Sequence, residues 1–449
     1  MQKKYQTSDL TVGKPIVKIF WFALPLVFGT LFQQLYSFVD TVIVGRCISA
    51  NALAAVGTTY SLHFLILGFV QGFCVGLGVP VSQSFGAKEP ENMHRYLWNG
   101  IWLCVAVSLV LSVAMTALTE PLLTLMHTPG ELFEMAAQYI RILFIGIPAS
   151  TLYNFSASVL RAVGDSKRPF YFLVFSSFLN IALDYILIVP FGMGVAGAAI
   201  ATVFSQLVSG VLNTWWLFAK TSVIRIRKEE TSFSVSHAKR LCVIGLPMGF
   251  EYSVSAIGAV IMQNSINLLG TVAVTAQTAG EKIRQMFTLP MESVGMAMTT
   301  YTGQNYGADR MDRVKSGIKS GLTIQAIYCV AAWIVIFFGK YALVALVLGE
   351  SSSAEAQGAV QYLSIISTLF ILHGSLMIFR NVLQGLGYSF QAILSGVGEL
   401  LGRSLGAWLA VCFTSYTAIC YSNPIAWGFA LCYCVFMVWR KLRNNDKAS

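Results

Sequence analysis

Residues 19–39, IFWFALPLVFGTLFQQLYSFV, decide the fold class, because the stretch from Ile19 to Val39 is free of charge and long enough to cross a bilayer. A helix needs roughly 20 mostly apolar residues to span the hydrocarbon core. Further charge-free runs are Tyr96–Thr119, Gly321–Gly339 and Ala356–Phe379. Only 11% of the 449 residues are charged, against about 25% in an ordinary globular domain. The sequence therefore predicts an all-α integral membrane protein.

Apolar runs between polar loops predict twelve transmembrane helices. The polar start of the chain, Met1–Lys14, is too long and too hydrophilic for a cleaved signal peptide, so we expect the first span to remain in the mature protein. The predicted spans lie near 19–43, 55–82, 96–118, 136–160, 169–190, 194–219, 241–267, 276–302, 318–339, 357–380, 388–411 and 422–439.

Lysine and arginine residues concentrate in alternate loops, as cytoplasmic loops of membrane proteins do. The segment 220–240 is the most basic, and Arg380 is assigned to another of these loops, whereas the opposite loop at 119–135 contains no Lys or Arg. Both termini are therefore predicted to be cytoplasmic. Orientation also explains the net charge of +10 without nucleic-acid binding, because the basic residues form no single face.

Three landmarks recur at a nearly constant spacing and indicate an internal repeat. Because each half then has an even number of spans, both halves share one orientation, and we expect a pseudo-two-fold axis along the membrane normal. The predicted architecture is two six-helix lobes, residues 1–219 and 241–449, joined by a cytoplasmic linker at 220–240. The landmarks are Leu24-Pro25 with Leu246-Pro247, QSFGA at 83–87 with QNYGA at 304–308, and VLRAVG at 159–164 with VLQGLG at 382–387.

Two aspartates of the first half lie inside predicted spans, where an ionisable side chain costs about 2.5 kcal/mol or more. Asp40 lies near the end of the first span and Asp184 near the end of the fifth, and both spans run outward. A rise of about 1.5 Å per residue places both acids, and Thr202 of the returning sixth span, at a similar depth. Asn180 lies one turn from Asp184 on the same helix face.

These four side chains are predicted to form one site for H⁺ or Na⁺. Two nearby carboxylates in a low dielectric cannot both ionise cheaply, so the pair is expected to take up a cation. If the ion is Na⁺, its metal ligands are Asp40, Asn180, Asp184 and Thr202. The alternative is that each aspartate lies near the interface and caps a helix or solvates an outer vestibule.

The second half contains acids in other settings. Glu251 lies near mid-membrane without a partner nearby in the sequence, so it is a candidate for attracting cationic substrates, with structural packing as the alternative. Glu399 and Arg403 have the i,i+4 spacing of a structural ion pair. Glu281 and Arg284 are expected at the outer interface. No phosphate-binding loop, H-E-x-x-H or G-x-S-x-G motif occurs, so we expect no enzyme and no cofactor besides the coupling ion.

Together these residues resemble the multidrug and toxic compound extrusion (MATE) transporters. The resemblance covers nearly the whole chain, including the duplicated Leu-Pro, Val39-Asp40-Thr41 and LRAVGD at 160–165. It is strongest to the DinF-type branch, whose N-lobe cation site uses two Asp, one Asn and one Thr. The matching residues are Asp40, Asp184, Asn180 and Thr202.

The resemblance implies a secondary active multidrug exporter, a cation (H⁺ or Na⁺)/organic-compound antiporter of the bacterial cytoplasmic membrane. Its expected partners are small amphipathic, cationic organic substrates and the lipid bilayer, with no nucleic acid, and the expected unit is a monomer. Gln34, Tyr139 and Asn154 match polar positions near the N-lobe cavity. With Glu251 they form the predicted substrate cavity.

Two comparisons narrow this prediction. NorM-type relatives also use a C-lobe acid pair in helices 7 and 10, but the tenth span here, Ala356–Phe379, lacks Asp and Glu, so the coupling site is placed in the N-lobe. A lipid-linked oligosaccharide flippase of the same superfamily is the main alternative. It is expected to have several cavity arginines, whereas only Arg403 is clearly inside a predicted span. A receptor or scaffold is disfavoured by the duplicated halves and the paired acids.

Overall fold

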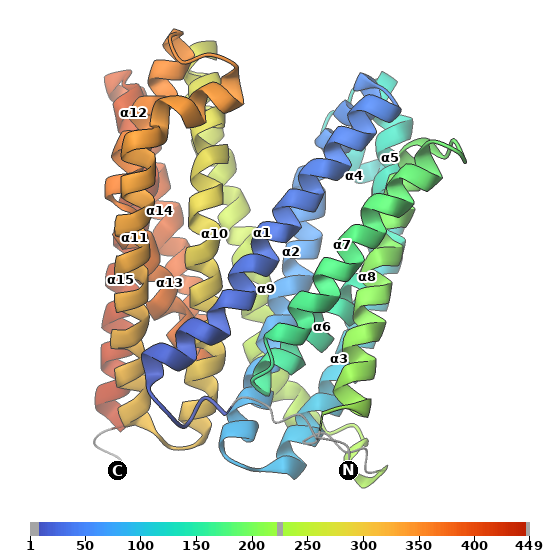
Figure 1. The fold of residues 1–449 in the computed structure, drawn as a ribbon, viewed down its shortest axis with the longest axis vertical. Helices are drawn as coiled ribbons and strands as arrows, with labels where there is room; N and C mark the ends of the chain where they lie inside the picture. The colour runs from blue at the N-terminus through green and yellow to red at the C-terminus, as the bar shows by residue number, and fades with distance from the viewer. Residues whose placement is uncertain (1–8, 222–227, 446–449) are drawn as a thin grey trace. The chain divides into compact units, whose positions relative to one another are not determined.

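The computed structural model describes residues 9–221 and 228–445, and these residues are almost entirely helical (Figure 1). The elements are α1 (Pro15–Cys47), α2 (Ala50–Gly86), α3 (Pro90–Ala117), α4 (Thr119–Leu125), α5 (Gly130–Ile145), α6 (Ile147–Ala162), α7 (Lys167–Ile188), α8 (Gly194–Ala219), η1 (Lys228–Glu230), α9 (Val235–Asn267), α10 (Thr271–Gly307), α11 (Met311–Leu348), α12 (Ala354–Thr368), α13 (Phe370–Gly385), α14 (Ser389–Phe413) and α15 (Tyr416–Asn445).

The helices account for all twelve predicted spans. Seven helices of the described part are long and apolar enough to cross a membrane, and two bent pairs raise this number to nine. The bends, 47° between α5 and α6 and 50° between α12 and α13, fall within the fourth and tenth spans. The long helices α9, α10 and α14 supply the remaining three, and α4 is a short helix outside this set. The twelve-helix prediction is confirmed.

The described chain divides into two compact units whose limits differ from those of the predicted lobes. Unit 1 includes Phe28–Gly249, and unit 2 includes Leu10–Val27 together with the residues from Phe250 onward. Helix α1 therefore begins in unit 2 and ends in unit 1, whereas α9 begins in unit 1 and ends in unit 2. The two exchange points are separated by as many residues as the two Leu-Pro landmarks, so they are equivalent positions of the repeat.

The repeat is also visible in the backbone. Helices α2 and α10 each have 37 residues. Each is followed by a residue in the left-handed region, Lys88 with φ 59° and Asp309 with φ 56°. Gly164 and Gly387, which end the VLRAVG and VLQGLG landmarks, both have φ 88°, a conformation that glycine adopts at no steric cost. The sequence landmarks thus mark equivalent turns.

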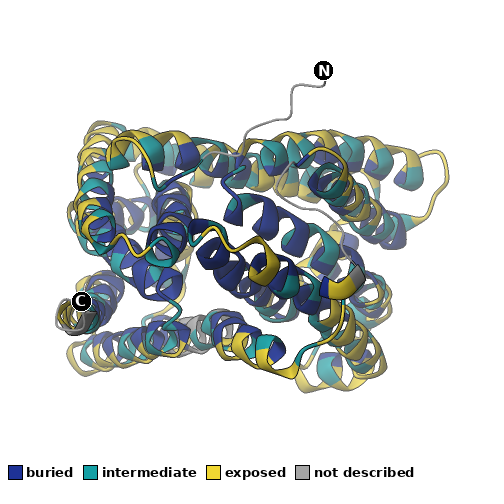
Figure 2. Cartoon of the chain, turned by 90° about the horizontal axis from the view of Figure 1, so that it is seen from below, coloured by how far each residue is buried: buried dark blue, intermediate teal, exposed yellow. Residues whose placement is uncertain are grey.

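Buried residues lie where helices of one unit face each other, and exposed residues lie on the outward faces (Figure 2). The exposed side chains are often large and apolar, such as Val110 and Val113 of α3 and Phe338 and Leu346 of α11. A soluble protein rarely exposes continuous apolar surfaces of this kind. These faces suit contact with lipid.

Close backbone contact in unit 1 joins α2 to the first half of α9. A Cβ atom on Gly72 would lie 2.3 Å from the carbonyl oxygen of Met248, and one on Gly76 would lie 2.6 Å from the Cα of Gly245. Real Cβ atoms do not approach other atoms so closely, so this contact requires glycine. It fixes the start of α9 against unit 1.

Candidate cation and substrate site

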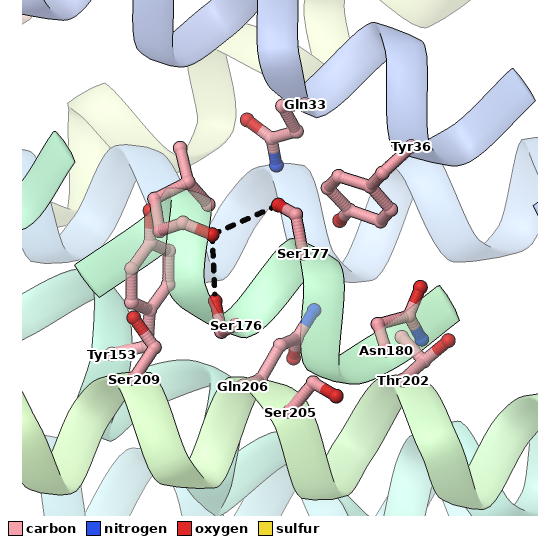
Figure 3. A pocket seen from close by; sticks show the side chains of 11 residues that line it. Gln33, Tyr36, Tyr153, Ser176, Ser177, Asn180, Thr202, Ser205, Gln206 and Ser209 are labelled. Atoms are coloured by element: carbon pink, nitrogen blue, oxygen red, sulfur yellow. Dashed lines mark hydrogen bonds between the residues drawn. The ribbon is translucent and has the colours of Figure 1, made fainter. Parts of the chain in front are cut away.

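Unit 1 contains a polar cavity bordered by α1, α6, α7 and α8 (Figure 3). It has about 350 Å³ of space not filled by protein atoms, part of which is open. Almost all lining side chains carry a hydroxyl, amide or phenol group and none is charged. They are Gln33, Tyr36, Tyr153, Leu173, Ser176, Ser177, Asn180, Thr202, Ser205, Gln206 and Ser209.

The two aspartates predicted as the cation site come together beside this cavity. Asp40 of α1 and Asp184 of α7 approach each other within hydrogen-bonding reach. Asp184 is fully buried. Its two carboxyl oxygens and Oδ1 of Asp40 receive no hydrogen bond from any other described residue, and no ion pair within the described chain involves either acid. Two carboxylates so placed repel each other unless a cation lies between them.

Two tyrosines complete the surroundings of the acids. Tyr36 and Tyr139 are close enough to both carboxyl groups to interact with them electrostatically. Tyr36 also lies close to Gln33, the residue that precedes the predicted Gln34, and both line the cavity. Because Tyr36 lines the cavity, it connects the acid pair with the cavity space.

Asn180 of α7 and Thr202 of α8, the other two predicted ligands, both line the cavity wall (Figure 3). Asn180 is 2% exposed, and neither its amide oxygen nor its nitrogen has a partner among the described residues. Carboxylate, amide and hydroxyl oxygens are hard ligands that suit Na⁺, and the acid pair alone suits a proton. The described residues contain no cluster of three His, Cys, Asp or Glu side chains that would hold a transition metal.

The predicted substrate residues lie in different places. Tyr139 is buried beside the acids. Asn154 donates to the backbone oxygen of Ser150 at 2.9 Å, and neither it nor Gln34 lines the cavity. The cavity instead uses Gln33 and Tyr153, which were not predicted from the sequence, along with the serines of α7 and α8. The helical spacing of those serines was the signal that could have revealed them.

Unit 2 contains a different arrangement of charges around Arg380 of α13. Its guanidinium group bonds to Glu399 and lies 3.3 Å from Oε1 of Glu251. Gln384 donates to the second oxygen of Glu251 at 2.7 Å, so this acid is not isolated. Arg403 donates to Glu399 at 3.0 Å, which confirms the predicted pair. The assignment of Arg380 to a loop is wrong, because α13 continues past it and its side chain turns into unit 2, where it is 6% exposed.

A second set of charges in unit 2 is centred on Glu281 of α10. This carboxylate pairs with Arg284 at 2.6 Å. It also accepts hydrogen bonds from Tyr362 at 2.6 Å and from Asn423 at 2.8 Å. These partners come from α12 and α15 and hold the carboxylate among the helices. Glu281 and Arg284 therefore face other helices of unit 2, and their position near the outer interface stays a prediction.

Comparison with known proteins identifies the family. The family description MatE matches residues 25–186 and again residues 247–408. The chain belongs to the MatE family. Both matches begin at the proline of a Leu-Pro landmark, so this MatE chain is a duplication with the predicted spacing. The resemblance to MATE transporters is confirmed.

Curated relatives of this MatE protein are named for multidrug resistance and export. It is 28% identical over 441 residues to the probable multidrug resistance protein YpnP of Bacillus subtilis (strain 168), covering 93% of this chain and 97% of that protein. It is 21% identical over 380 residues to the multidrug export protein MepA of Staphylococcus aureus (strain MRSA252), covering 84% of each chain. The MatE chain is thus a membrane-embedded member of a family of multidrug transporters.

Solved structures of MATE transporters share the fold. One shows the outward-facing conformation of a multidrug resistance MATE family transporter of the MOP superfamily, with a TM-score of 0.92, 22% identity and 99% coverage of both chains. Another is a MOP superfamily transporter from Pyrococcus furiosus whose binding pocket is described as reversed in polarity. It has a TM-score of 0.89 and 24% identity, covering 98% of this chain and all of that one. These likenesses establish the MATE fold.

Proposed function

We propose that this protein is a secondary active exporter that exchanges H⁺ or Na⁺ for small amphipathic, predominantly cationic organic compounds. Membership in the MatE family and relatives named for multidrug resistance and export support the transport of organic compounds. The distribution of Lys and Arg supports an orientation with both termini in the cytoplasm. The bacterial relatives support a location in the bacterial cytoplasmic membrane. We take a single chain as the transporting unit.

The observation that carries the proposal is the pair of half-buried Asp40 and fully buried Asp184, which lie together without a basic partner among the described residues. Such a pair lowers its free energy by binding one cation, and it loses that gain when the cation leaves. The free energy of the pair therefore depends on its occupancy. An exporter driven by a cation gradient needs a site with this property.

Coupling follows if the cation and the organic substrate favour different arrangements of unit 1, because a ligand shifts an equilibrium only by its differential affinity. Tyr36 gives the structural basis, since it lines the cavity and interacts with both carboxyl groups. We place the organic substrate along the cavity wall formed by Gln33, Tyr36 and Tyr153. Asn180 and Thr202 supply neutral oxygens, so their replacement should weaken coupling less than loss of either acid.

The flippase alternative gains no support from the arginines that lie among the helices of unit 2. Arg284, Arg380 and Arg403 are all held by carboxylates of unit 2. An arginine already neutralised by a carboxylate is a weak ligand for a lipid-linked phosphate.

The test is transport by purified protein in proteoliposomes with an imposed H⁺ or Na⁺ gradient, comparing Asp40→Asn, Asp184→Asn and the double variant with wild type. Each single variant should lose most gradient-driven transport, by about tenfold or more. The double variant should be little worse, because the two acids act as a unit. Asp312→Asn, an exposed acid paired with Arg310, is the control and should transport normally. Near-normal driven transport in either single variant would place the coupling site elsewhere.

A further inference from the structure

A stripe of polar side chains continues from the acid pair along one face of α8. Thr202, Ser205, Ser209 and Asn213 recur about once per turn, on the helix that leads to the linker. Ser205 is 4% exposed, Ser209 1% and Asn213 0%. For these three residues, none of the side-chain oxygen or nitrogen atoms has a partner among the described residues.

The facing helix α7 contributes a matching row. Ser176, Ser177 and Asn180 line the same cavity as Thr202, Ser205 and Ser209 of α8, with Ser177 pointing toward Gln33 of α1 (Figure 3). The hydroxyls of Ser176 and Ser177 donate to the backbone oxygen of Leu173 at 3.0 and 2.9 Å, which leaves their lone pairs free to accept. The cavity therefore offers donors and acceptors from both walls.

Unpaired polar groups at these positions require an explanation, because burying a polar group without a hydrogen bond is costly. Ordered water is the usual partner in polar sites with enough room. Successive stripe positions lie about 6 Å apart along the helix axis. One water that bonds to two oxygens spans about 5.6 Å, so single waters fit between successive groups.

We propose that this stripe holds a chain of water molecules that conducts a proton between the Asp40–Asp184 pair and the inner half of unit 1. The inference rests on the proposed function and deepens it by assigning H⁺ as the coupling ion. In such a chain the water molecules pass the proton, and the hydroxyl and amide groups hold these waters in place by donating and accepting hydrogen bonds. Sodium would need several oxygens at every step, whereas Ser209 and Asn213 each supply only one.

The stripe ends one turn beyond Asn213, where the same face carries Trp216 and the buried Leu217. The Trp216 ring packs against Phe172, with ring centroids 6.2 Å apart. The Arg168 guanidinium carbon lies 4.2 Å from the centroid of the same ring. An apolar end beside a positive charge opposes a continuous leak of protons. The proton then passes this end only when the Trp216 packing changes.

The test compares Asn213→Leu and the double variant Ser205→Ala/Ser209→Ala with Thr214→Val. Thr214 is the matched control, because it lies on the same turn as Asn213 but its hydroxyl is already bonded to the Gly210 oxygen at 2.8 Å. Three quantities are measured in each variant: thermal unfolding in detergent, affinity for a fluorescent organic cation, and transport driven by a pH gradient in proteoliposomes.

We expect both stripe variants to unfold at the wild-type temperature or higher, because the removed groups bond to no other described residue and their loss leaves no protein group without a partner. The affinity of Asn213→Leu for the organic cation should be unchanged, because Asn213 does not line the cavity. The pH-driven transport of both stripe variants should fall about tenfold. Thr214→Val should match wild type in all three. Asn213→Ser replaces the amide with a hydroxyl that can still bond to water, so it should recover part of the transport. It is the variant to measure if Asn213→Leu does not fold.

Wild-type transport in both stripe variants, with Asp40→Asn still inactive, would overturn the water chain and leave the proposed function intact. Normal transport by Asp40→Asn would instead overturn the proposed function. Transport driven by Na⁺ alone at constant pH would also overturn the proton route.

Discussion

Unit 1 places the half-buried Asp40 beside the buried Asp184 with no basic partner in the described part of the chain, whereas unit 2 combines Glu251, Glu281 and Glu399 with three arginines. Both arrangements place acids among helices, where an uncompensated charge is expensive. In unit 2 the compensation is built into the chain. In unit 1 the compensating charge has to be supplied by a bound cation.

The presence or absence of an arginine partner distinguishes the two sets of acids. The acids of unit 2 suit a structural role, and the acids of unit 1 suit a site that binds and releases a cation. Arginine remains protonated in proteins, so the carboxylates of unit 2 keep their counter-charges at all times. The acids of unit 1 can gain or lose a cation with a large change in free energy. Glu251, proposed from the sequence as a substrate residue, belongs to the compensated set, since Arg380 and Gln384 bind its two oxygens.

The largest effect on stability is expected from Arg380→Met. This change removes the guanidinium group that Glu251 and Glu399 share, and only Glu399 keeps an arginine, Arg403, among the described residues. Breaking a buried pair in this way costs about 3–5 kcal/mol. Thermal unfolding in detergent measures the loss. A triple variant that also carries Glu251→Gln and Glu399→Gln should recover much of it. If Arg380→Met unfolds like wild type, unit 2 is not held together by this cluster.

A smaller effect of opposite sign is expected from Asp184→Asn. Removing one of two unpaired acids relieves their repulsion, so the variant should gain about 1 kcal/mol of stability while losing coupled transport. The gain should be greater at alkaline than at acidic pH, because repulsion grows as protons leave the pair. Denaturation of wild type and variant across pH provides the measurement. A loss of stability at every pH would mean that the pair is compensated by a partner.

The smallest effect is expected from Glu120→Gln. Glu120 forms an ion pair with Arg141 at 2.7 Å, but the two side chains are 63% and 43% exposed. Exposed pairs of this kind contribute about 0.2–1 kcal/mol. The unfolding temperature should therefore change little, and added salt should remove the difference. A loss comparable with that of Arg380→Met would show that burial does not decide the cost.

Much of the fold could be predicted from the sequence, because spans are set by length and charge. The first and seventh predicted spans fall within α1 and α9, and the repeat landmarks mark equivalent turns. The bend at Leu369, between α12 and α13, was not predicted, since no proline lies there. The exchange of α1 and α9 between the units was also missed, because it depends on tertiary contacts such as the close approach of Gly72 to Met248.

Only those site residues could be predicted from the sequence whose type is rare inside a membrane span. Asp40 and Asp184 stand out because charges inside spans are expensive, and their similar depth implied that they meet. The serines that line the cavity did not stand out, because serine in a membrane helix often only bonds to the backbone of its own helix. Arg380 was wrongly assigned to a loop because it is the first charged residue after a long apolar run, and such a position usually marks the end of a span.

The exchange of α1 and α9 also has a consequence for biosynthesis. Unit 1 contains the start of α9, which the ribosome makes only after the linker, so the first six spans cannot complete their unit when they emerge. The start of α1 is made first but belongs to unit 2. Its packing partners in that unit are made only after residue 249. A chain interrupted at the linker would lack the segment that Gly72 and Gly76 of α2 contact. Neither half is therefore a finished folding unit by itself.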